Sequence, residues 1–317
     1  MRKRDNLGAF RLAASALIAL TLCLPLSGAS QGQGATKAGD DGKLRIIVFG
    51  AHPDDCELRA GGVAAMWASQ GHHVKFVSVT NGDIGHATMA GAPLAKRRTE
   101  EVKKADKVLG IETEVLDIHD GELMPTLENR RAIVRLIRQW KADIVIGHRP
   151  NDYHPDHRYV GVLMQDAAFM VTVAHFCPDV QQLAKNPVFL YLSDNFQKPN
   201  PFEPAVVVGI DEVFEKKMDA IWCLESQIES LWATGNFEKV VPVPQEPAAR
   251  EQRKQEVAKR FSQRDAAIAN KYRAKLVELY GDEKGKKIRQ GEAFELCEYG
   301  RQPSAQELRQ LFPFFNR

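Results

Sequence analysis

Short apolar runs alternate with amphipathic segments through the first half of the chain. The run "LRIIVFG" at residues 44–50 is continuous and apolar, which is typical of a strand buried on both faces. Further strands are predicted at residues 73–80, 113–118 and 142–148. Strand–helix alternation at this spacing predicts βαβ units and a mostly parallel sheet.

The segments between these strands have helical patterns. Residues 61–71 have helical character and stop at a glycine, residues 95–109 form a basic amphipathic pattern closed by Gly110, and residues 127–140 form another amphipathic pattern. The sequence therefore predicts an α/β fold. We expect a Rossmann-like, mostly parallel sheet with helices on both faces.

The pattern is looser in the second half. Residues 160–174 predict a long buried helix, and residues 187–193 and 205–210 predict two more strands. Asp211 would cap a helix that runs to roughly Ser230. Beyond it the chain becomes charged and helical.

We expect a single domain over residues 44–317, with a helical C-terminal extension over about residues 245–317. Its amphipathic face should pack on the first part of the domain. Two independent domains are the alternative.

The N-terminus has the layout of a secretory signal peptide. Basic residues precede an apolar stretch at residues 12–26, and small residues at 27–29 offer a cleavage site. The apolar stretch is shorter than the ~20 residues that a membrane span needs. We expect residues 1–29 to direct export to the periplasm or the exterior, and residues 30–43 to form a flexible leader. An uncleaved N-terminal anchor is the alternative.

The composition narrows the class of protein. With 44% hydrophobic and 26% charged residues, the 317-residue chain is an ordinary globular protein, and its formal charge of +2 gives no case for a nucleic-acid partner. The cysteines after the signal peptide contain no CxxC pair, which argues against a zinc ribbon and a redox motif. Export would permit disulfides, and the sequence leaves open whether any form. These cysteines are Cys56, Cys177, Cys223 and Cys297.

Two of the predicted strands end in residues that can bind a metal ion. The first strand is followed by "AHPDD" at residues 51–55. In open parallel sheets ligands bind at the carboxyl ends of the strands, so segments that follow different strands can meet there. The segment after the fourth strand contains His148, Asp152, His154, Asp156 and His157.

Zinc prefers imidazole nitrogen and carboxylate oxygen, and a catalytic zinc keeps three protein ligands and a water. His52 and Asp55 can converge on one ion across a proline turn, and a nitrogen from the second segment would complete the set. Asp54 would then lie beside the bound water, where a carboxylate can take its proton. Each segment alone has a simpler explanation, a helix N-cap for "HPDD" and a solvated turn for "HPDH". Their joint occurrence favours a metal site.

These motifs resemble the PIG-L/LmbE-type zinc-dependent N-deacetylases. The resemblance spans roughly residues 45–166, and the paired first and last motifs are its most specific part. Its motifs are "AHPDD" at 51–55, "TNGDIG" at 80–85, "RTEEVKKADKVLG" at 98–110, "DGEL" at 120–123 and "HPDH" at 154–157, with weaker landmarks "SQ" at 226–227 and "GEAFE" at 291–295.

The resemblance implies roles for individual residues. It makes His52, Asp55 and His157 the zinc ligands and Asp54 the general base that activates the zinc-bound water. It makes His154 the residue that stabilises the oxyanion, and a protonated imidazole could also supply the proton that the amine leaving group needs. Asp156 would orient the loop or a ligand.

Other residues are candidates for substrate contact. Arg98 matches an arginine that faces the substrate in the family, and a surface salt bridge with Glu101 is the alternative. Cys56 stands where the family often has glutamate; we expect a small buried thiol, with an extra metal ligand as the alternative. The full set of candidate contacts is Arg98, Asp83, His86, Asp120, Arg149 and Tyr153.

The function implied by the resemblance is a hydrolase with a Zn²⁺ cofactor. It would remove an N-acetyl or other N-acyl group from a glucosamine-type sugar or sugar conjugate, which is a small-molecule or glycan substrate. One alternative is an amidase acting on another amide of a sugar conjugate. The other is an exported carbohydrate-binding protein without turnover, which would have no need of Asp54 as a base.

Overall fold

The computed structural model describes residues 41–235 and 239–315. Residues from 42 onward form one compact unit. The predicted signal peptide at residues 1–29 lies outside the described residues, as does most of the predicted leader at 30–43. The predicted signal peptide, leader and domain boundaries therefore stay predictions.

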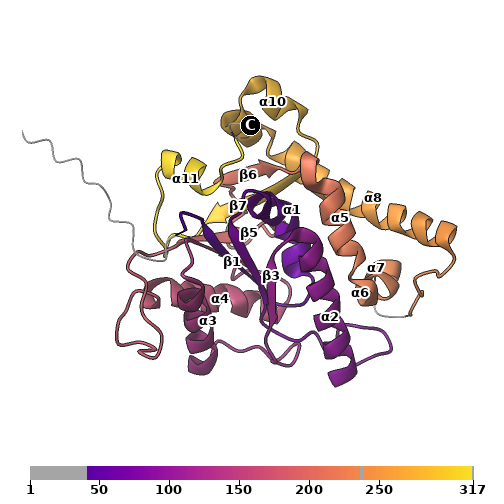
Figure 1. Cartoon of the computed structure of the whole chain (residues 1–317), viewed down its shortest axis with the longest axis horizontal. Coiled ribbons are helices and arrows are strands. Elements are labelled where there is room, and N and C mark those ends of the chain that lie inside the picture. Colours follow the sequence, from indigo (N-terminus) through magenta and orange to yellow (C-terminus); the bar gives the residue numbers. More distant parts are fainter. Residues whose placement is uncertain (1–40, 236–238, 316–317) are drawn as a thin grey trace, which may run out of the picture. The chain divides into compact units, whose positions relative to one another are not determined.

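A seven-stranded sheet organises the described residues, in the order β3-β2-β1-β4-β5-β7-β6 (Figure 1). Strands β1 to β5 pair in parallel, whereas β7 is antiparallel to both β5 and β6. The predicted α/β fold with a mostly parallel sheet is confirmed. The strands are β1 (Arg45–Gly50), β2 (His73–Ser78), β3 (Glu112–Val115), β4 (Ile144–Gly147), β5 (Val188–Leu192), β6 (Val206–Gly209) and β7 (Gly291–Leu296).

Helices connect the strands and follow them. In the described ranges, none of them is long and apolar enough to cross a membrane. They are α1 (Asp55–Ser69), α2 (Ala92–Leu109), α3 (Leu127–Trp140), α4 (Pro155–Met170), α5 (Phe214–Trp222), α6 (Glu225–Glu229), α7 (Leu231–Thr234), α8 (Pro247–Lys271), α9 (Arg273–Tyr280), α10 (Asp282–Lys287) and α11 (Ala305–Leu311), with a 3-10 turn at Asp211–Val213.

Two predicted helix starts are wrong. The first helix begins at Asp55, six residues before the predicted start at residue 61, so the "HPDD" segment leads directly into it and ends at its first residue. Asp211 does not cap the next helix, because its carboxylate accepts hydrogen bonds from the backbone N–H groups of Arg289 and Gln290 instead. The predicted helix from 211 to 230 is divided into a 3-10 turn and the separate helices α5 and α6.

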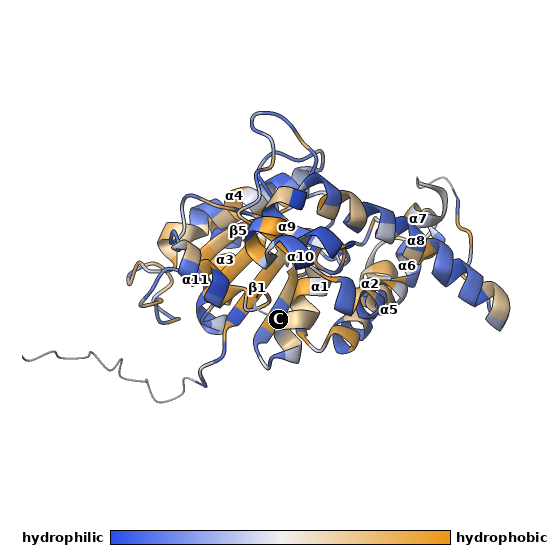
Figure 2. Ribbon diagram, turned by 90° about the horizontal axis from the view of Figure 1, so that it is seen from above, coloured by the Kyte–Doolittle hydropathy of each residue, from blue (hydrophilic) through white to orange (hydrophobic). Residues whose placement is uncertain are grey.

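Successive side chains of β1 project from opposite faces of the sheet. Ile46 and Val48 belong to the apolar cluster that includes residues of α1, α2 and α5. Ile47 and Phe49 belong to a second cluster, formed with residues of α3 and α4. The sheet is therefore covered by helices on both faces, and Figure 2 shows the apolar colours concentrated in its strands.

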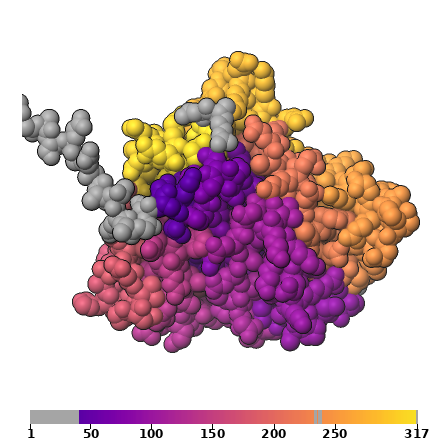
Figure 3. All heavy atoms as spheres, viewed as in Figure 1, coloured from indigo at the N-terminus to yellow at the C-terminus, as the bar shows by residue number. Residues whose placement is uncertain are grey.

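The C-terminal residues pack on the start of the fold. Trp67 of α1 donates from Nε1 to the carbonyl of Leu311 at 2.9 Å, and its ring lies 5.0 Å from that of Phe312. Figure 3 shows this C-terminal segment beside the first residues of the sheet and α1. In the interior, Glu292 of β7 accepts hydrogen bonds from the backbone N–H groups of Gly62 and Val63. Strand β7 thus fixes α1, the helix that starts at the candidate site.

Candidate metal centre

The segments that follow β1 and β4 meet, as their strand positions predict. The two strands are neighbours in parallel register, with Phe49 opposite Gly147. Just beyond them, the N–H of Ala51 donates to Nε2 of His148 at 3.2 Å. A Cβ atom at Gly50 would lie 2.8 Å from the Cβ atom of Asp55, so only glycine allows the chain to turn this tightly into α1.

Three atoms of the predicted ligand set form a nearly equilateral triangle. His52 Nδ1 lies 3.4 Å from Asp55 Oδ2, which lies 3.5 Å from His157 Nε2, and the two ring nitrogens are 3.3 Å apart. A tetrahedral zinc ion with bonds of about 2.0–2.1 Å holds its ligand atoms roughly 3.4 Å apart. The geometry and the donor types of these residues therefore fit a zinc ion.

The cluster offers further ligand atoms around the triangle. Ring nitrogens of His52, His154 and His157 lie within 4.8 Å of one another, and so do ligand atoms of Asp55, His148 and His157. Another such group joins His52 and His154 to Asp120 and Asp156. The described residues thus contain a buried histidine–aspartate cluster suited to a metal ion, and the exact ligand set stays a prediction.

Carboxylates behind the two imidazoles orient the ring nitrogens. His52 Nε2 lies 3.1 Å from Asp120 Oδ1 and 3.3 Å from Asp156 Oδ2, so Nδ1 is left to face Asp55. His157 Nδ1 lies 3.1 Å from Asp152 Oδ1, so Nε2 is left to face the same point. Carboxylates behind metal-binding imidazoles commonly fix the tautomer in this way.

Neighbouring groups shift the pKa values of His52 and Asp55 in opposite directions. Burial by itself would lower the pKa of His52, but hydrogen bonds to Asp120, Asp156 and Asp55 outweigh burial and raise it well above its usual value. Burial would raise the pKa of Asp55, yet the neighbouring imidazoles of His157 and His148 hold it well below its usual range. Asp55 is therefore an anion at neutral pH, as a metal ligand must be.

Asp54 has a different environment from Asp55. It occupies the N-cap position of α1 but makes no capping hydrogen bond from its side chain, so the simpler N-cap explanation fails there. Its Oδ2 lies 3.3 Å from Nη2 of Arg98. Burial raises the pKa of Asp54, and the Arg98 guanidinium opposes this rise. A buried carboxylate with a raised pKa is suited to accept a proton.

Arg98 is buried at the site and does not form the surface salt bridge considered as the alternative. Besides Asp54, it donates to the carbonyl oxygens of Gly82 and Pro53, each at 3.1 Å. The ion pair with Glu101 belongs to Arg97 instead. The guanidinium therefore connects the loop after β2 to the loop after β1 and holds Asp54 in place.

His154 caps α4 with its side chain. Its Nδ1 accepts from the N–H of Asp156 at 3.2 Å, and Pro155 follows at the first helical position. The ring stands edge-on to His52 with centroids 4.5 Å apart. Burial, together with the charges of His52 and His157, lowers its pKa. Because Nδ1 is used by the cap, Nε2 is the atom available to a ligand.

Among the other predicted contacts, Asp120 lies at the centre, Asp83 supports it, and His86 contacts Glu229 and its own loop. Asp83 accepts from His119 Nδ1 at 2.7 Å and from the N–H of Asp120 at 3.1 Å, which positions Asp120 beside His52. His86 lies 3.3 Å from Glu229 and its Nδ1 accepts from backbone N–H groups of its own loop. The side chains of Asp83 and His86 are therefore engaged by protein partners.

Arg149 and Tyr153 differ in whether protein partners engage their side chains. The guanidinium of Arg149 is buried and paired with Asp194 at 3.1 Å and with Glu295 at 3.0 Å. Tyr153 is 71% exposed, and its ring lies 5.6 Å from that of His157. Tyr153 is thus free to contact a substrate, whereas Arg149 joins the loop after β4 to β5 and β7.

His148 ends the fourth predicted strand and Asp152 follows it, but the sequence predicted no role for either of them. The ring of His148 stacks on His157 at 4.1 Å, and its Nε2 lies 3.2 Å from Asp55 Oδ2. Burial and the charge of His157 lower the pKa of His148 to about 4, so the ring is neutral. The available signal was the position of His148, directly after a strand that ends at the site.

Cys56 lies in the apolar core and not at the centre. Its Sγ donates to the carbonyl of Val48 at 3.6 Å, and burial raises its pKa well above the usual value. This agrees with the expected small buried thiol. The thiols of the described residues are all free, including those of Cys177, Cys223 and Cys297.

Known proteins have sequences similar to that of this chain. Residues 47–168 match a family model described as "PIG-L: GlcNAc-PI de-N-acetylase". The chain is 32% identical over 197 residues to a diacetylchitobiose deacetylase of Thermococcus kodakarensis, covering 59% of this chain and 72% of that protein. It is 27% identical over 194 residues to a 4-oxalmesaconate hydratase of Pseudomonas putida, covering 59% of this chain and 74% of the hydratase.

Solved structures show the same fold. An N,N'-diacetylchitobiose deacetylase from Pyrococcus horikoshii superposes with a TM-score of 0.60 at 21% identity, covering 83% of this chain and 88% of that chain. The enzymes among these relatives include N-deacetylases, which hydrolyse amide bonds, as well as a hydratase. The protein therefore belongs to the PIG-L/LmbE deacetylase family.

Proposed function

We propose that the protein is a zinc-dependent hydrolase that removes an N-acetyl or related N-acyl group from a glucosamine-type sugar or sugar conjugate. The observation that carries the proposal is the triangle of His52 Nδ1, Asp55 Oδ2 and His157 Nε2, with sides of 3.3–3.5 Å. Asp54 follows His52 by two residues, and its carboxylate is not among the triangle's atoms. A centre built only for binding would not require this additional buried carboxylate.

The residues divide the chemistry of amide hydrolysis between them. A bound zinc ion would supply Lewis-acid polarisation of the amide carbonyl and a water of lowered pKa. Asp54 would take the proton of the attacking water, because burial favours its protonated form once the proton is transferred. Arg98 holds the Asp54 carboxylate in position before and after this transfer.

His154 would act on the opposite side of the amide. Its Nε2 is available because Nδ1 accepts the capping hydrogen bond. A protonated Nε2 would donate a hydrogen bond to the oxygen that becomes negative during attack. To protonate the amine, which is a poor leaving group until then, the ring would have to be an imidazolium, which returns to neutral imidazole when it gives up one proton.

The relatives support the type of substrate. Similar proteins include the diacetylchitobiose deacetylase and a probable N-acetyl-alpha-D-glucosaminyl L-malate deacetylase of Bacillus cereus, 28% identical over 201 residues. The hydratase of Pseudomonas putida favours a second candidate function, addition of water to a carbon–carbon double bond at the same centre. Amide hydrolysis is preferred because it explains a residue placed to donate a proton to a leaving group.

The test is acetate release by the zinc-loaded full chain. We would assay N,N'-diacetylchitobiose, N-acetylglucosamine and an N-acetylglucosaminyl malate, each with and without a chelator. Release that the chelator abolishes and zinc restores is expected. If zinc binds but no acylated amino sugar is hydrolysed, while an unsaturated dicarboxylate is hydrated, the hydratase is the correct function.

We further propose that the protein is exported, on the basis of the signal-peptide pattern at residues 1–29. N-terminal sequencing of the protein recovered from its host is the test. A mature chain beginning near residue 30 is expected, whereas a chain that still begins at residue 1 would leave the anchor as the correct alternative.

A further inference from the structure

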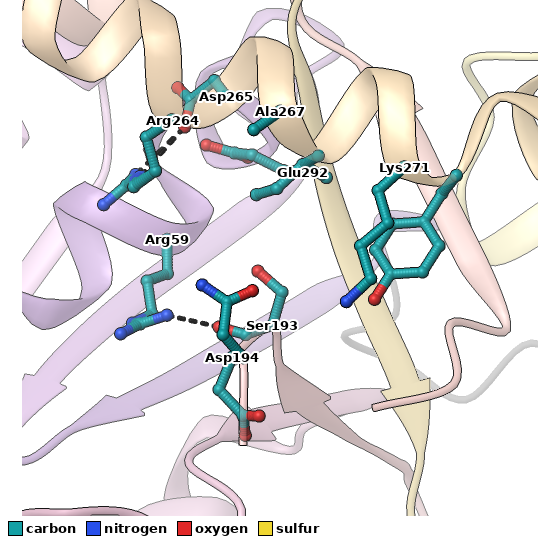
Figure 4. A pocket seen from close by; sticks show the side chains of 11 residues that line it. Arg59, Ser193, Asp194, Arg264, Asp265, Ala267, Lys271 and Glu292 are labelled. Atoms are coloured by element: carbon teal, nitrogen blue, oxygen red, sulfur yellow. Dashed lines mark hydrogen bonds and ion pairs between the residues drawn. The ribbon is translucent and has the colours of Figure 1, made fainter. Parts of the chain in front are cut away.

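A small pocket shares helix α1 with the metal centre. It has a volume of about 120 Å³ and is bounded by α1, the segment after β5, helix α8 and strand β7. A water molecule occupies about 30 Å³ of liquid, so the pocket has room for a small chemical group. Figure 4 shows Arg59 and Arg264 on one side of it and Lys271 on the other.

The carboxylates of this pocket are already neutralised by partners. Asp265 and Glu292 share the ammonium group of Lys217, at 2.6 Å and 2.8 Å, and all three side chains are almost completely buried. Asp265 also pairs with Arg264 at 3.1 Å. These contacts use the negative charges of the pocket wall within the protein.

Asp194 is neutralised in the same way. Its carboxylate pairs with Arg149 at 3.1 Å. Arg149 also binds the carbonyl of Asn200 and approaches Glu295, so the whole group is held by the protein. Every acidic side chain that lines the pocket thus has a cationic partner within the protein, and Arg149 serves both Asp194 and Glu295.

Two cations of the pocket, Arg59 and Lys271, have no carboxylate in direct contact, although Arg59 lies near enough to Asp194 to act on its charge. In the described part of the chain, Arg59 forms no ion pair; its Nη1 donates to the carbonyl of Ser193, which leaves most of its five N–H groups unused. Lys271 also forms no ion pair there, and its ammonium lies 5.0 Å from the ring centre of Tyr272. A guanidinium and an ammonium that face one small space attract a negatively charged group.

The pocket lies close to the reacting centre. Arg59 follows Asp55 by four residues on α1, so the two lie on the same side of that helix. Asp194 also connects the pocket to Arg149, the residue that follows His148.

We propose that this pocket is an anion site, in which Arg59 and Lys271 bind a carboxylate or phosphate group. The group could belong to an acidic substrate or to a free small anion. Both would satisfy the unused donors of Arg59 and offset the excess positive charge. The site is separate from the atoms that carry the proposed hydrolysis, so it does not depend on that function.

Titration calorimetry of the full chain with inorganic phosphate is the test of binding. A chelator is present, because phosphate could otherwise bind a metal ion at the centre. Replacing one charged donor by an uncharged amide is expected to raise the dissociation constant at least about tenfold, in both Arg59→Gln and Lys271→Gln. Lys259→Gln removes the same charge from an exposed position on α8 and should leave the constant within about twofold of the wild type.

The outcomes separate the possibilities. Absence of phosphate binding by the wild type, or equal weakening in Lys271→Gln and Lys259→Gln, overturns the proposal. Because Lys271 is exposed, its variant should fold even if Arg59→Gln does not. Neither result depends on turnover, so failure of the anion site and failure of the hydrolase proposal can be told apart.

A kinetic comparison then identifies the source of the anion. The KM of N-acetylglucosamine 6-phosphate is compared with that of N-acetylglucosamine in the wild type and Lys271→Gln. A rise for the phosphorylated sugar alone assigns the site to an acidic substrate. Unchanged KM values, with phosphate binding lost in the variant, assign it to a free anion.

Discussion

Two segments with the same His-Pro-Asp letters follow β1 and β4, and they are used differently. After β1, the helix begins at Asp55, so Asp54 occupies the N-cap position and its carboxylate turns to Arg98. After β4, the helix begins at Pro155, so His154 occupies the N-cap position and does cap the helix. A shift of two residues in the helix start, relative to the aligned motifs, thus changes which side chain is left for chemistry.

The neighbours of each segment explain the difference. Asp156, the aspartate of the second segment, is fully buried and accepts from the N–H groups of Gly121 and Leu123. Asp54, the corresponding aspartate of the first segment, forms an ion pair with Arg98. The first segment therefore provides the imidazole of His52 and two carboxylates, whereas the second provides two imidazoles. The role of a motif residue follows from its partners and not from its letter.

The largest expected effect separates the two aspartates of the first segment. Asp54→Asn should keep the metal ion and lower kcat by about 10³-fold or more, since it removes the base. Asp55→Asn should instead lose the metal ion, because it removes an anionic ligand from the triangle. Metal content by atomic absorption, together with kcat, distinguishes the two results.

The opposite result is informative for the same pair. If Asp54→Asn loses the metal ion and Asp55→Asn retains it, the roles proposed for these neighbours are exchanged. The circular dichroism of both variants serves as the control that the loop change has not unfolded the protein.

The two histidines of the second segment should differ by a smaller factor. His154→Asn keeps a side chain that can cap α4 and should keep the metal ion, while kcat falls about 10²-fold through loss of the proton donor. His157→Gln should lose the metal ion, because it removes a corner of the triangle. Equal metal loss in both variants would show that His154 is itself a ligand, which its position within 4.8 Å of His52 and His157 would allow.

The carboxylate behind His157 provides a third comparison. Asp152→Asn removes the anion that faces His157 Nδ1 at 3.1 Å but leaves the predicted ligands in place. The affinity for zinc should fall about 10–100-fold, as is usual when such a partner is lost. Competition with a chelating dye measures the change, and Asp117→Asn, an exposed aspartate outside the cluster, is a suitable control. Unchanged affinity would mean that Asp152 holds only the loop.

The sequence was sufficient for the first half of the fold because its buried parallel strands are short, continuous apolar runs. β7 was missed for a physical reason. Its sequence places Glu292 in the interior, where Lys217 and two backbone N–H groups of α1 neutralise it. A charged residue at a buried position interrupts the apolar pattern from which a strand is predicted.

The site was predicted to the extent that it depends on strand ends. His52, Asp55 and His157 come together because β1 and β4 are adjacent and parallel. The pairing of Arg98 with Asp54 could not be predicted, because it depends on how α2 packs beside the first turn of α1. The same limit applies to Arg149, whose partners come from the segment after β5 and from β7.

The smallest expected effect concerns a third group of carboxylates, which has no cation. Glu57 and Asp106 lie buried against one another between α1 and α2, and neither forms an ion pair in the described residues. Burial raises the pKa of Glu57 well above its usual value and that of Asp106 to about 7. In contrast to Asp54 and Asp55, this pair is expected to hold a proton in the folded state.

This raised pKa makes stability depend on pH in a direction that can be tested. Between about pH 4 and pH 7 this pair binds more protons in the folded protein than in the unfolded chain, so its contribution to the free energy of unfolding should fall as the pH rises, by at most about 1.4 kcal/mol per unit of raised pKa. Asp106→Asn removes one carboxyl group of the pair and should reduce this fall by about 1–2 kcal/mol in urea unfolding at pH 5.5 and 8. Relative to the wild type, Asp106→Asn should therefore lose less free energy of unfolding at pH 8 than at pH 5.5. Glu122→Gln, at an exposed position, should leave the difference between the two pH values as it is in the wild type. If the free energy of unfolding of Asp106→Asn falls as much between pH 5.5 and pH 8 as that of the wild type, the pair is not protonated. A buried carboxylate in this fold could then keep its charge without the cations that surround Asp54 and Asp55.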